Sequence, residues 1–147
     1  MSQGLVLPKN SGCAFCDYLS GRRSYTILER DELTATLVTR EQRGEPHLLV
    51  IPIAHHATLL ELQDSEARAL MIAVRDAARL IDVAYRRPGI AVWQNNGVDA
   101  EQTVRHLHFH VAGTLDGGGT ERGTVAEVSV EETDKIAQRL RQHMSHR

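Results

Sequence analysis

Three histidines alternate with apolar residues in the stretch HLHFHV, residues 106–111. Successive side chains of a β-strand point to opposite faces, so His106, His108 and His110 share one face and the apolar residues share the other. The pattern predicts a strand whose apolar face packs on the core. Its histidine face then looks at solvent, a ligand or a metal ion.

A single metal ion cannot explain all three histidines. At about 3.3 Å per residue, His106 and His110 lie about 13 Å apart along a strand, too far for two imidazoles to bind one ion at about 2.1 Å. A neutral imidazole can act as a nucleophile, as a general acid or base, and as a donor to phosphate. The row therefore favours catalysis over a merely polar surface.

A polar turn, residues 95–103, precedes the histidine row. Gly97 permits unusual backbone angles, while Asn95, Gln102 and Thr103 offer amide and hydroxyl groups that can hydrogen-bond phosphate oxygens. Backbone N–H groups of such a turn can also stabilise a developing negative charge. The turn and the histidine row together predict a phosphate site.

The remaining pattern predicts strands on both sides of one long helix. Apolar residues recur every three or four positions from Asp64 until Pro88 and Gly89, which predicts a helix, and Ser129 opens a second one. This order favours an α+β fold with a largely antiparallel sheet. The segments expected to form strands are 25–31, 33–39, 47–53, 90–94, 104–115 and, ambiguously, 124–130.

The bulk properties fit one globular domain, because the chain has 147 residues of which 41% are hydrophobic and 24% charged. We expect a flexible arm over residues 1–12, which lack periodicity, and a single domain over residues 13–147. A net charge of -2 argues against nucleic acid and anionic membranes as partners. The sequence shows neither a signal-like start nor a long apolar run, which predicts a cytoplasmic protein.

The two cysteines, Cys13 and Cys16, form a C-x-x-C pair. In a reducing compartment such a pair indicates a metal knuckle or a redox couple more often than a structural disulfide. A redox couple is typical of a thioredoxin-like βαβ unit, which this sequence lacks. A metal site, a redox couple and a simple apolar pair remain the alternatives.

The stretch HLHFHVA resembles the signature of the histidine triad (HIT) family, His-φ-His-φ-His-φ-φ with φ apolar. Two further blocks are similar to the family in the same order, PHLLVIPIAHH around His47 and the turn NNGVDAEQTVRH. The resemblance covers roughly residues 13–115. It implies a mainly antiparallel sheet of about five strands with a long central helix and a C-terminal helix, and a homodimer.

The resemblance also implies a nucleotide hydrolase or nucleotidyltransferase that acts at an α-phosphate. By this analogy His108 attacks phosphorus and forms a nucleotidyl-histidine, while the backbone carbonyl of His106 holds its other ring nitrogen. His110 contacts the phosphate and assists the leaving group. The phosphate oxygens are held by Asn95, Gln102 and Thr103. The implied partner is a purine nucleotide or a nucleotide conjugate, such as a nucleoside phosphoramidate, a dinucleoside polyphosphate or an adenylated adduct.

The stretch CAFC resembles the C-x-x-C of bacterial, Hint-like members of the family that hold zinc. The positions that match their zinc ligands are Cys13, Cys16, His47 and His106, a set suited to a tetrahedral structural site. In zinc-free relatives the histidine equivalent to His47 instead lies beneath the triad. His55 and His56 are expected at a strand end or at the substrate rim, and Trp93 in core or dimer packing.

Two departures from the family pattern keep other functions open. Thr39 stands where the family has Asp or Asn to bind ribose, and Glu101 stands where a glycine usually precedes Gln102. The second hypothesis is therefore a non-catalytic, zinc-stabilised module that binds nucleotides or other partners. A third is metal-dependent hydrolysis with zinc at His106 and His108.

Overall fold

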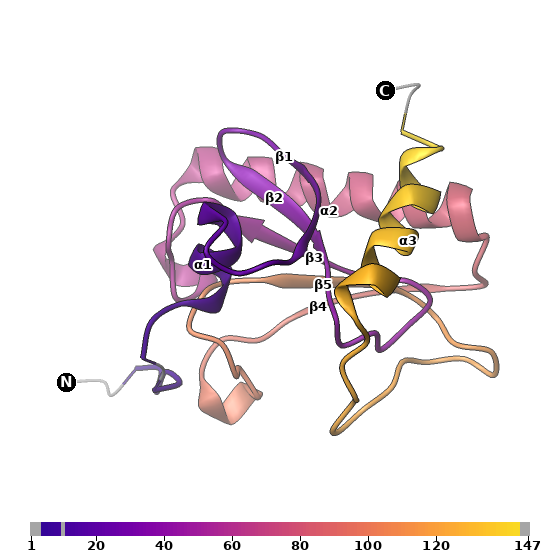
Figure 1. The fold of residues 1–147 in the computed structure, drawn as a ribbon. Helices are drawn as coiled ribbons and strands as arrows, with labels where there is room; N and C mark the ends of the chain where they lie inside the picture. Colours follow the sequence, from indigo (N-terminus) through magenta and orange to yellow (C-terminus); the bar gives the residue numbers. More distant parts are fainter. Residues whose placement is uncertain (1–3, 10, 145–147) are drawn as a thin grey trace.

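The computed structural model describes residues 4–9 and 11–144 (Figure 1). No helix among these residues is long and apolar enough to cross a membrane. The elements in chain order are α1 (Ala14–Ser20), β1 (Thr26–Arg30), β2 (Thr34–Val38), β3 (His47–Pro52), the 3-10 helix η1 (Leu59–Glu61), α2 (Asp64–Tyr85), β4 (Ile90–Gln94), the 3-10 helix η2 (Val98–Ala100), β5 (Phe109–Gly113) and α3 (Val130–Arg141).

The five strands form one sheet in the order β1-β2-β3-β5-β4, and all neighbours are antiparallel. Leu37 lies opposite Leu49, Leu49 opposite His110, and His110 opposite Trp93. Residues directly opposite one another in antiparallel strands share a face, so His110 and Trp93 lie on the same side of the sheet. The predicted α+β class and the mainly antiparallel sheet are confirmed.

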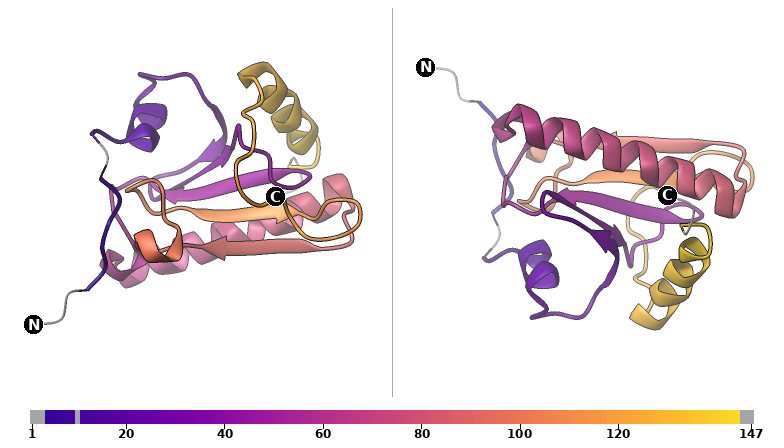
Figure 2. Two further views of the ribbon diagram at one scale, coloured as in Figure 1. Left: turned by 90° about the horizontal axis from the view of Figure 1, so that it is seen from below. Right: turned by 90° about the horizontal axis from the view of Figure 1, so that it is seen from above.

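Helix α2 covers the other face of the sheet (Figure 2). Its apolar stripe packs on Leu48 and Val50 of β3 and on Val111 of β5, and Ala137 and Leu140 of α3 join the same cluster. The residues of α2 in this cluster are Leu70, Val74, Ala77, Leu80, Ile81 and Ala84. The period of three and four residues in the sequence thus identified the layer that buries the apolar face of the histidine strand.

Helix α1 lies on the histidine side of the sheet (Figure 2), and the sequence did not predict it. It has 7 residues, too few to establish a helical period. The Sγ atom of Cys13 caps it by accepting a hydrogen bond from Cys16 N at 3.2 Å. Phe15 is buried against Leu37, Leu49 and Ile51. The C-x-x-C pair is therefore the start of a helix docked beside the histidines.

Two strand predictions need correction. The segment 104–115 is strand only from Phe109 to Gly113, because pairing with β3 ends where Val50 meets Phe109. Upstream of this point, Leu107 N donates to His56 O at 2.7 Å instead. The segment 124–130 is not a strand, although Val128 N donates to Arg40 O at 2.8 Å.

The segment 4–9 contacts the polar turn. Val98 N donates to Val6 O at 2.7 Å, and Pro8 is buried. Residues 1–3 and 10 of the expected arm lie outside the described residues. The boundary between an arm over residues 1–12 and a domain over residues 13–147 stays a prediction.

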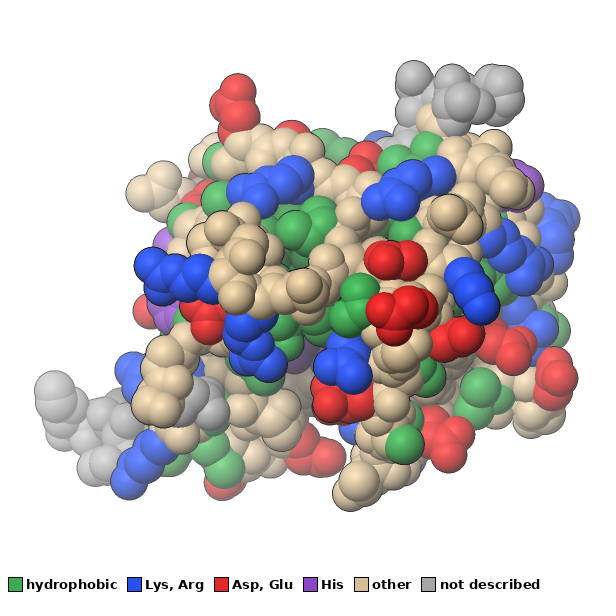
Figure 3. All heavy atoms as spheres, viewed as in Figure 1, with side chains coloured by type: hydrophobic (Ala, Val, Ile, Leu, Met, Phe, Trp, Pro, Cys, Tyr) green, Lys and Arg blue, Asp and Glu red, His purple; other side chains and the backbone are tan. Residues whose placement is uncertain are grey.

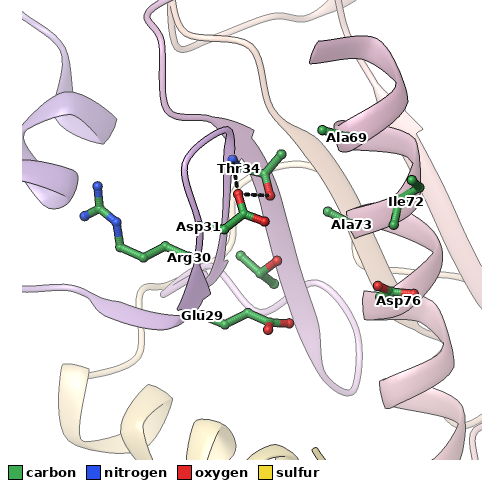
Figure 4. Close-up of a pocket in the computed structure, with 9 residues that line it drawn as sticks. Glu29, Arg30, Asp31, Thr34, Ala69, Ile72, Ala73 and Asp76 are labelled. Carbon is green, nitrogen blue, oxygen red and sulfur yellow. Dashed lines mark hydrogen bonds between the residues drawn. The ribbon is translucent and has the colours of Figure 1, made fainter. Parts of the chain in front are cut away.

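A cavity of about 270 Å³ lies between the β1–β2 hairpin and α2 (Figure 4). Thr34 and Thr36 of β2 and Ile72 of α2 line it, so it opens on the sheet face that α2 covers. The sheet separates this cavity from the histidines. On the face drawn in Figure 3, positive and negative side chains are interspersed, so recognition of an anion there depends on individual groups.

Candidate active site and metal centre

The three histidines of the row lie where β5 begins. His106 and His108 are 0% and 9% exposed and precede the strand, whereas His110 belongs to it and is partly exposed. The rings of His108 and His110 are 4.9 Å apart between centroids. Phe15 of α1 meets the rings of His106 and His108 edge to face, at 5.5 and 5.1 Å. The row is therefore a packed centre beneath α1.

His108 has the geometry of a nucleophile. Its Nδ1 lies 2.8 Å from the backbone O of His106, which confirms the predicted hydrogen bond. Burial lowers the pKa of His108, so its ring is neutral near pH 7. A neutral ring that donates through Nδ1 keeps its lone pair on Nε2. Nε2 can therefore attack an electrophile.

His47 contacts the ring of His110. His47 Nε2 lies 3.0 Å from His110 Nδ1, which joins β3 to β5. Two backbone groups meet the other nitrogen of His47, Nδ1: Arg43 N at 3.1 Å and the carbonyl O of Glu41 at 3.0 Å. The N–H of Arg43 suits an unprotonated Nδ1 and the carbonyl suits a protonated one. Both tautomers of His47 thus have a partner.

Four side chains converge at the other end of β3. The ligand atoms of Cys13, Cys16, His55 and His106 all lie within 4.8 Å of one another. His106 Nδ1 is 3.2 Å from Cys13 Sγ, 3.7 Å from Cys16 Sγ and 3.1 Å from His55 Nδ1. A tetrahedral zinc ion with bonds of about 2.1 Å to nitrogen and about 2.3 Å to sulfur places two nitrogens about 3.4 Å apart, and a nitrogen and a sulfur about 3.6 Å apart. The donor set fits that ion.

The surroundings of these donors support metal binding. His106 Nε2 lies 3.0 Å from Pro52 O, and a proton on Nε2 leaves Nδ1 free to bind a metal. The pKa of the Cys16 thiol is raised to about 11, mainly by burial. The hydrogen bond with Cys13 and the charge of Cys13 contribute to this rise. A cation between the two sulfurs removes this penalty and favours thiolates.

The predicted ligand set, Cys13, Cys16, His47 and His106, is corrected at one position. His55 joins the cluster and His47 does not. His47 begins β3, whereas the cluster lies beyond Pro52, where β3 ends, about 16 Å further along the strand. The sequence places one histidine before β3 and another after it, but no sequence signal shows which end of the strand faces α1.

His108 is not among the four donors, and its Nδ1 is tied to the backbone of His106. The structure therefore does not bring together the pair His106 and His108 that metal-dependent hydrolysis requires. His106 belongs to the cluster of metal donors, whereas His108 lies outside it. This separation favours a structural metal over a catalytic one.

Gln102 of the polar turn lies inside its loop. Its Oε1 accepts from Gly97 N at 2.7 Å, and its Nε2 donates to Ala57 O and Val104 O at 2.8 and 2.9 Å. Asn95 Nδ2 donates to Ala100 O at 2.8 Å, and Thr103 is exposed. The side chain of Gln102 is thus occupied in shaping the turn, while Thr103 is exposed beside it.

The two departures from the family pattern have local explanations. Thr39 Oγ1 accepts from Tyr25 Oη at 3.3 Å and from Glu41 N at 3.1 Å, so this hydroxyl already has protein partners. Glu101 has a φ of 70°, a left-handed conformation that glycine adopts without steric cost. Its side chain is exposed. The position of Glu101 therefore explains a glycine preference by backbone angle alone.

The burial of His47 predicts a loss of stability in acid. Burial lowers the pKa of His47 to about 4, with smaller lowering effects from Arg43 and His108, whereas an unfolded histidine titrates near about 6.5. Between these values the unfolded chain binds a proton that the folded chain does not. The free energy of unfolding therefore falls as the pH drops from about 6.5 towards 4, by up to about 1.4 kcal/mol per unit for each such histidine.

Urea unfolding at a series of pH values measures this slope. His47→Gln removes one titrating group and should flatten the slope, whatever its effect at pH 7. The matched control is His143→Gln, because His143 is exposed. Equal slopes for the wild type and His47→Gln would contradict a neutral, buried His47.

The HIT domain model matches residues 22–116 of the chain. An uncharacterized HIT-like protein of Saccharolobus solfataricus is 32% identical over 69% of this chain and 73% of its own length. An adenosine 5'-monophosphoramidase of Candida albicans is 25% identical over 95% of both chains.

Solved structures show the same fold. A Hit-like protein of Bartonella henselae superposes with a TM-score of 0.82 at 22% identity, over 92% of this chain and 98% of its own. A zinc-bound histidine triad family protein of Mycobacterium smegmatis gives a TM-score of 0.76 at 24% identity, over 92% and 97%. Together with the histidine row and the two blocks that precede it, the match to the HIT domain model and the relative at 32% identity show that the chain belongs to the HIT domain family.

Proposed function

We propose that this protein hydrolyses or transfers nucleotides at an α-phosphate, with His108 as the nucleophile. The observation that carries the proposal is the 2.8 Å contact between His108 Nδ1 and the His106 carbonyl, which leaves Nε2 free to attack. Membership of a family with a relative named as an adenosine 5'-monophosphoramidase supports the nucleotide as substrate. Dinucleoside polyphosphates and adenylated adducts carry the same phosphate and belong to the same class.

In the first step His108 Nε2 forms a bond to phosphorus and the bond from phosphorus to the leaving group breaks. The leaving group takes a proton from an imidazolium form of His110. Burial keeps the pKa of His110 far below its usual range in the free protein, and the bound phosphate anion raises it. Protonated His110 can donate through Nδ1 to His47 Nε2, at 3.0 Å, and through Nε2 to the leaving group.

In the second step water attacks phosphorus and gives a proton to His110, which the first step left neutral; the nucleotidyl-histidine bond breaks, and the nucleoside monophosphate leaves with His108 restored. Another nucleophile in place of water gives transfer. We assign phosphate contacts to Thr103, Asn95 and the N–H groups of the polar turn. Gln102 keeps that turn in shape through its three hydrogen bonds. The turn then presents donors to the charge that develops on phosphate oxygens.

We propose further that Cys13, Cys16, His55 and His106 hold a structural zinc ion. The zinc-bound relative of Mycobacterium smegmatis and the Cys₂His₂ donor set support this metal. The ion supplies a cross-link between α1 and the segment before β5. Both cysteines are free thiols in the structure, which suits the reducing cytoplasm we propose as its location.

A homodimer through β4 completes the proposal. β4 ends the sheet, so one side of it has no partner strand among the described residues. Val92 of β4 is 49% exposed and Met71 of α2 is 58% exposed. Open edges that carry exposed apolar residues favour pairing with a second copy.

A non-catalytic nucleotide-binding module is the second candidate. It is favoured by the engagement of Thr39 Oγ1 with Tyr25 and Glu41, which occupies the position where the family binds ribose. Such a module would bind adenosine monophosphate and form no covalent adduct.

Brief exposure to adenosine 5'-phosphoramidate should add one adenylyl group to His108, detected by mass spectrometry of peptides. His108→Asn should lose turnover by about a thousandfold or more, because the attacking nitrogen is gone. His143→Asn makes the same exchange at an exposed position and should be neutral. Turnover that survives His108→Asn would refute the mechanism. Binding of adenosine monophosphate without adduct or turnover would favour the non-catalytic module.

Zinc analysis of dialysed protein should give one ion per chain. Cys13→Ser, Cys16→Ser and His55→Gln should lose the ion, whereas His47→Gln should keep it, because His47 lies outside the cluster. Retention by His55→Gln with loss by His47→Gln would restore the ligand set expected from the sequence. A structural ion also predicts that zinc-depleted protein unfolds at lower temperature but still forms the His108 adduct.

Light scattering after size exclusion should give the mass of a dimer. Val92→Lys should shift the equilibrium towards monomer, since it places a charge on the open edge where the second copy would pack. Val83→Lys is the matched control, because Val83 of α2 is 51% exposed away from that edge. A wild-type monomer, or a dimer insensitive to Val92→Lys, would contradict this interface.

A further inference from the structure

Trp93, the single tryptophan of the chain, lies against the catalytic row. It is directly opposite His110 in the pairing of β4 with β5, on the histidine side of the sheet. The two rings are stacked, with centroids 4.6 Å apart and planes only 5° from parallel. Trp93 also meets the ring of His47 at 5.3 Å. The sequence pattern alone does not connect this tryptophan with the histidines.

The stack restrains a torsion of His110 that its hydrogen bond to His47 leaves open. The imidazole of a histidine turns about a torsion with broad, weak preferences. The hydrogen bond between His47 Nε2 and His110 Nδ1 anchors one atom of the ring but leaves the ring free to tilt about it. A parallel indole covers one face and removes that freedom. The direction in which His110 Nε2 points therefore depends on Trp93.

The stack also favours a positive charge on His110. An aromatic face attracts a cation that lies over it, and tryptophan is the strongest such face among the side chains. The charged or titratable groups that act on His110 are His47 from β3, His108 from its own segment and Arg43 from the loop before β3, and all of them disfavour its protonation. Trp93 opposes these three groups, because its face favours the protonated form of His110.

We propose that Trp93 is a positioning residue for His110, which fixes the plane of the imidazole and stabilises its protonated form beside the leaving group. The inference rests on the proposed function, in which His110 supplies the proton. Trp93 itself touches neither the nucleotide nor the metal in this scheme. Its effect is on the chemical step and not on substrate binding.

The test compares hydrolysis of adenosine 5'-phosphoramidate by the wild type, Trp93→Phe and Trp93→Leu. Trp93→Leu should lower kcat by about three- to thirtyfold and leave KM within about twofold, while Trp93→Phe keeps a ring and should stay within about threefold of the wild type. The basic limb of the kcat profile should move to lower pH in Trp93→Leu, by up to about one unit. Tyr85→Leu, which removes a ring stacked on Arg139, is the matched control.

A second measurement needs no turnover. The ring protons of His110 should show an upfield ring-current shift in NMR spectra, which Trp93→Leu abolishes and Trp93→Phe partly keeps. An active wild type with normal kcat in Trp93→Leu, a loss confined to KM, equal losses in both variants, or unchanged His110 resonances would each overturn the inference. An inactive wild type would instead refute the proposed function, and the positioning of His110 for that reaction would fall with it.

Discussion

The arrangement of the site depends on the place where β5 leaves the ladder of β3. Pairing stops at Val50 and Phe109, and Leu107 N then turns to His56 O at 2.7 Å. This exchange of partners frees His106 to reach the carbonyl of Pro52 with its ring and to offer its own carbonyl to His108. Had the strand continued, the carbonyl of His106 would have belonged to the ladder. Two of the three histidines therefore take their positions outside the strand.

His106 consequently links two kinds of chemistry. Its Nδ1 lies among the metal donors, while its carbonyl sets the tautomer of His108. Phe15, placed between the two cysteines in sequence, packs against both rings. In the proposed reaction, a metal ion at the cluster would therefore stabilise the segment that holds His108 without approaching Nε2 of His108. A metal site beside His108 can thus be structural.

The sequence predicted what short-range patterns encode. The long helix, the central strand and the strand hairpin follow from periodicity and local chemistry, whereas the hydrogen bond of His108 to the carbonyl of His106 came from the resemblance to the family, and the structure confirms all four. The exchange of His47 for His55 was not predictable, because it depends on which end of β3 lies near α1. The stack of Trp93 on His110 depends on the register between β4 and β5. Both depend on tertiary contacts, which the pattern of a single sequence does not encode.

The histidines of the site are neutral near pH 7 in the free protein. His108 is held by a carbonyl, and His110 is held by His47, which in turn meets the backbone of Arg43 and Glu41. Burial depresses the pKa of each of these rings, so neutral imidazoles line the free site near pH 7. Because His47 has both a donor and an acceptor at Nδ1, it can accommodate either protonation state of His110. In the proposed reaction, a bound phosphate would supply the charge that favours the protonated state of His110, so that proton supply would depend on the presence of substrate.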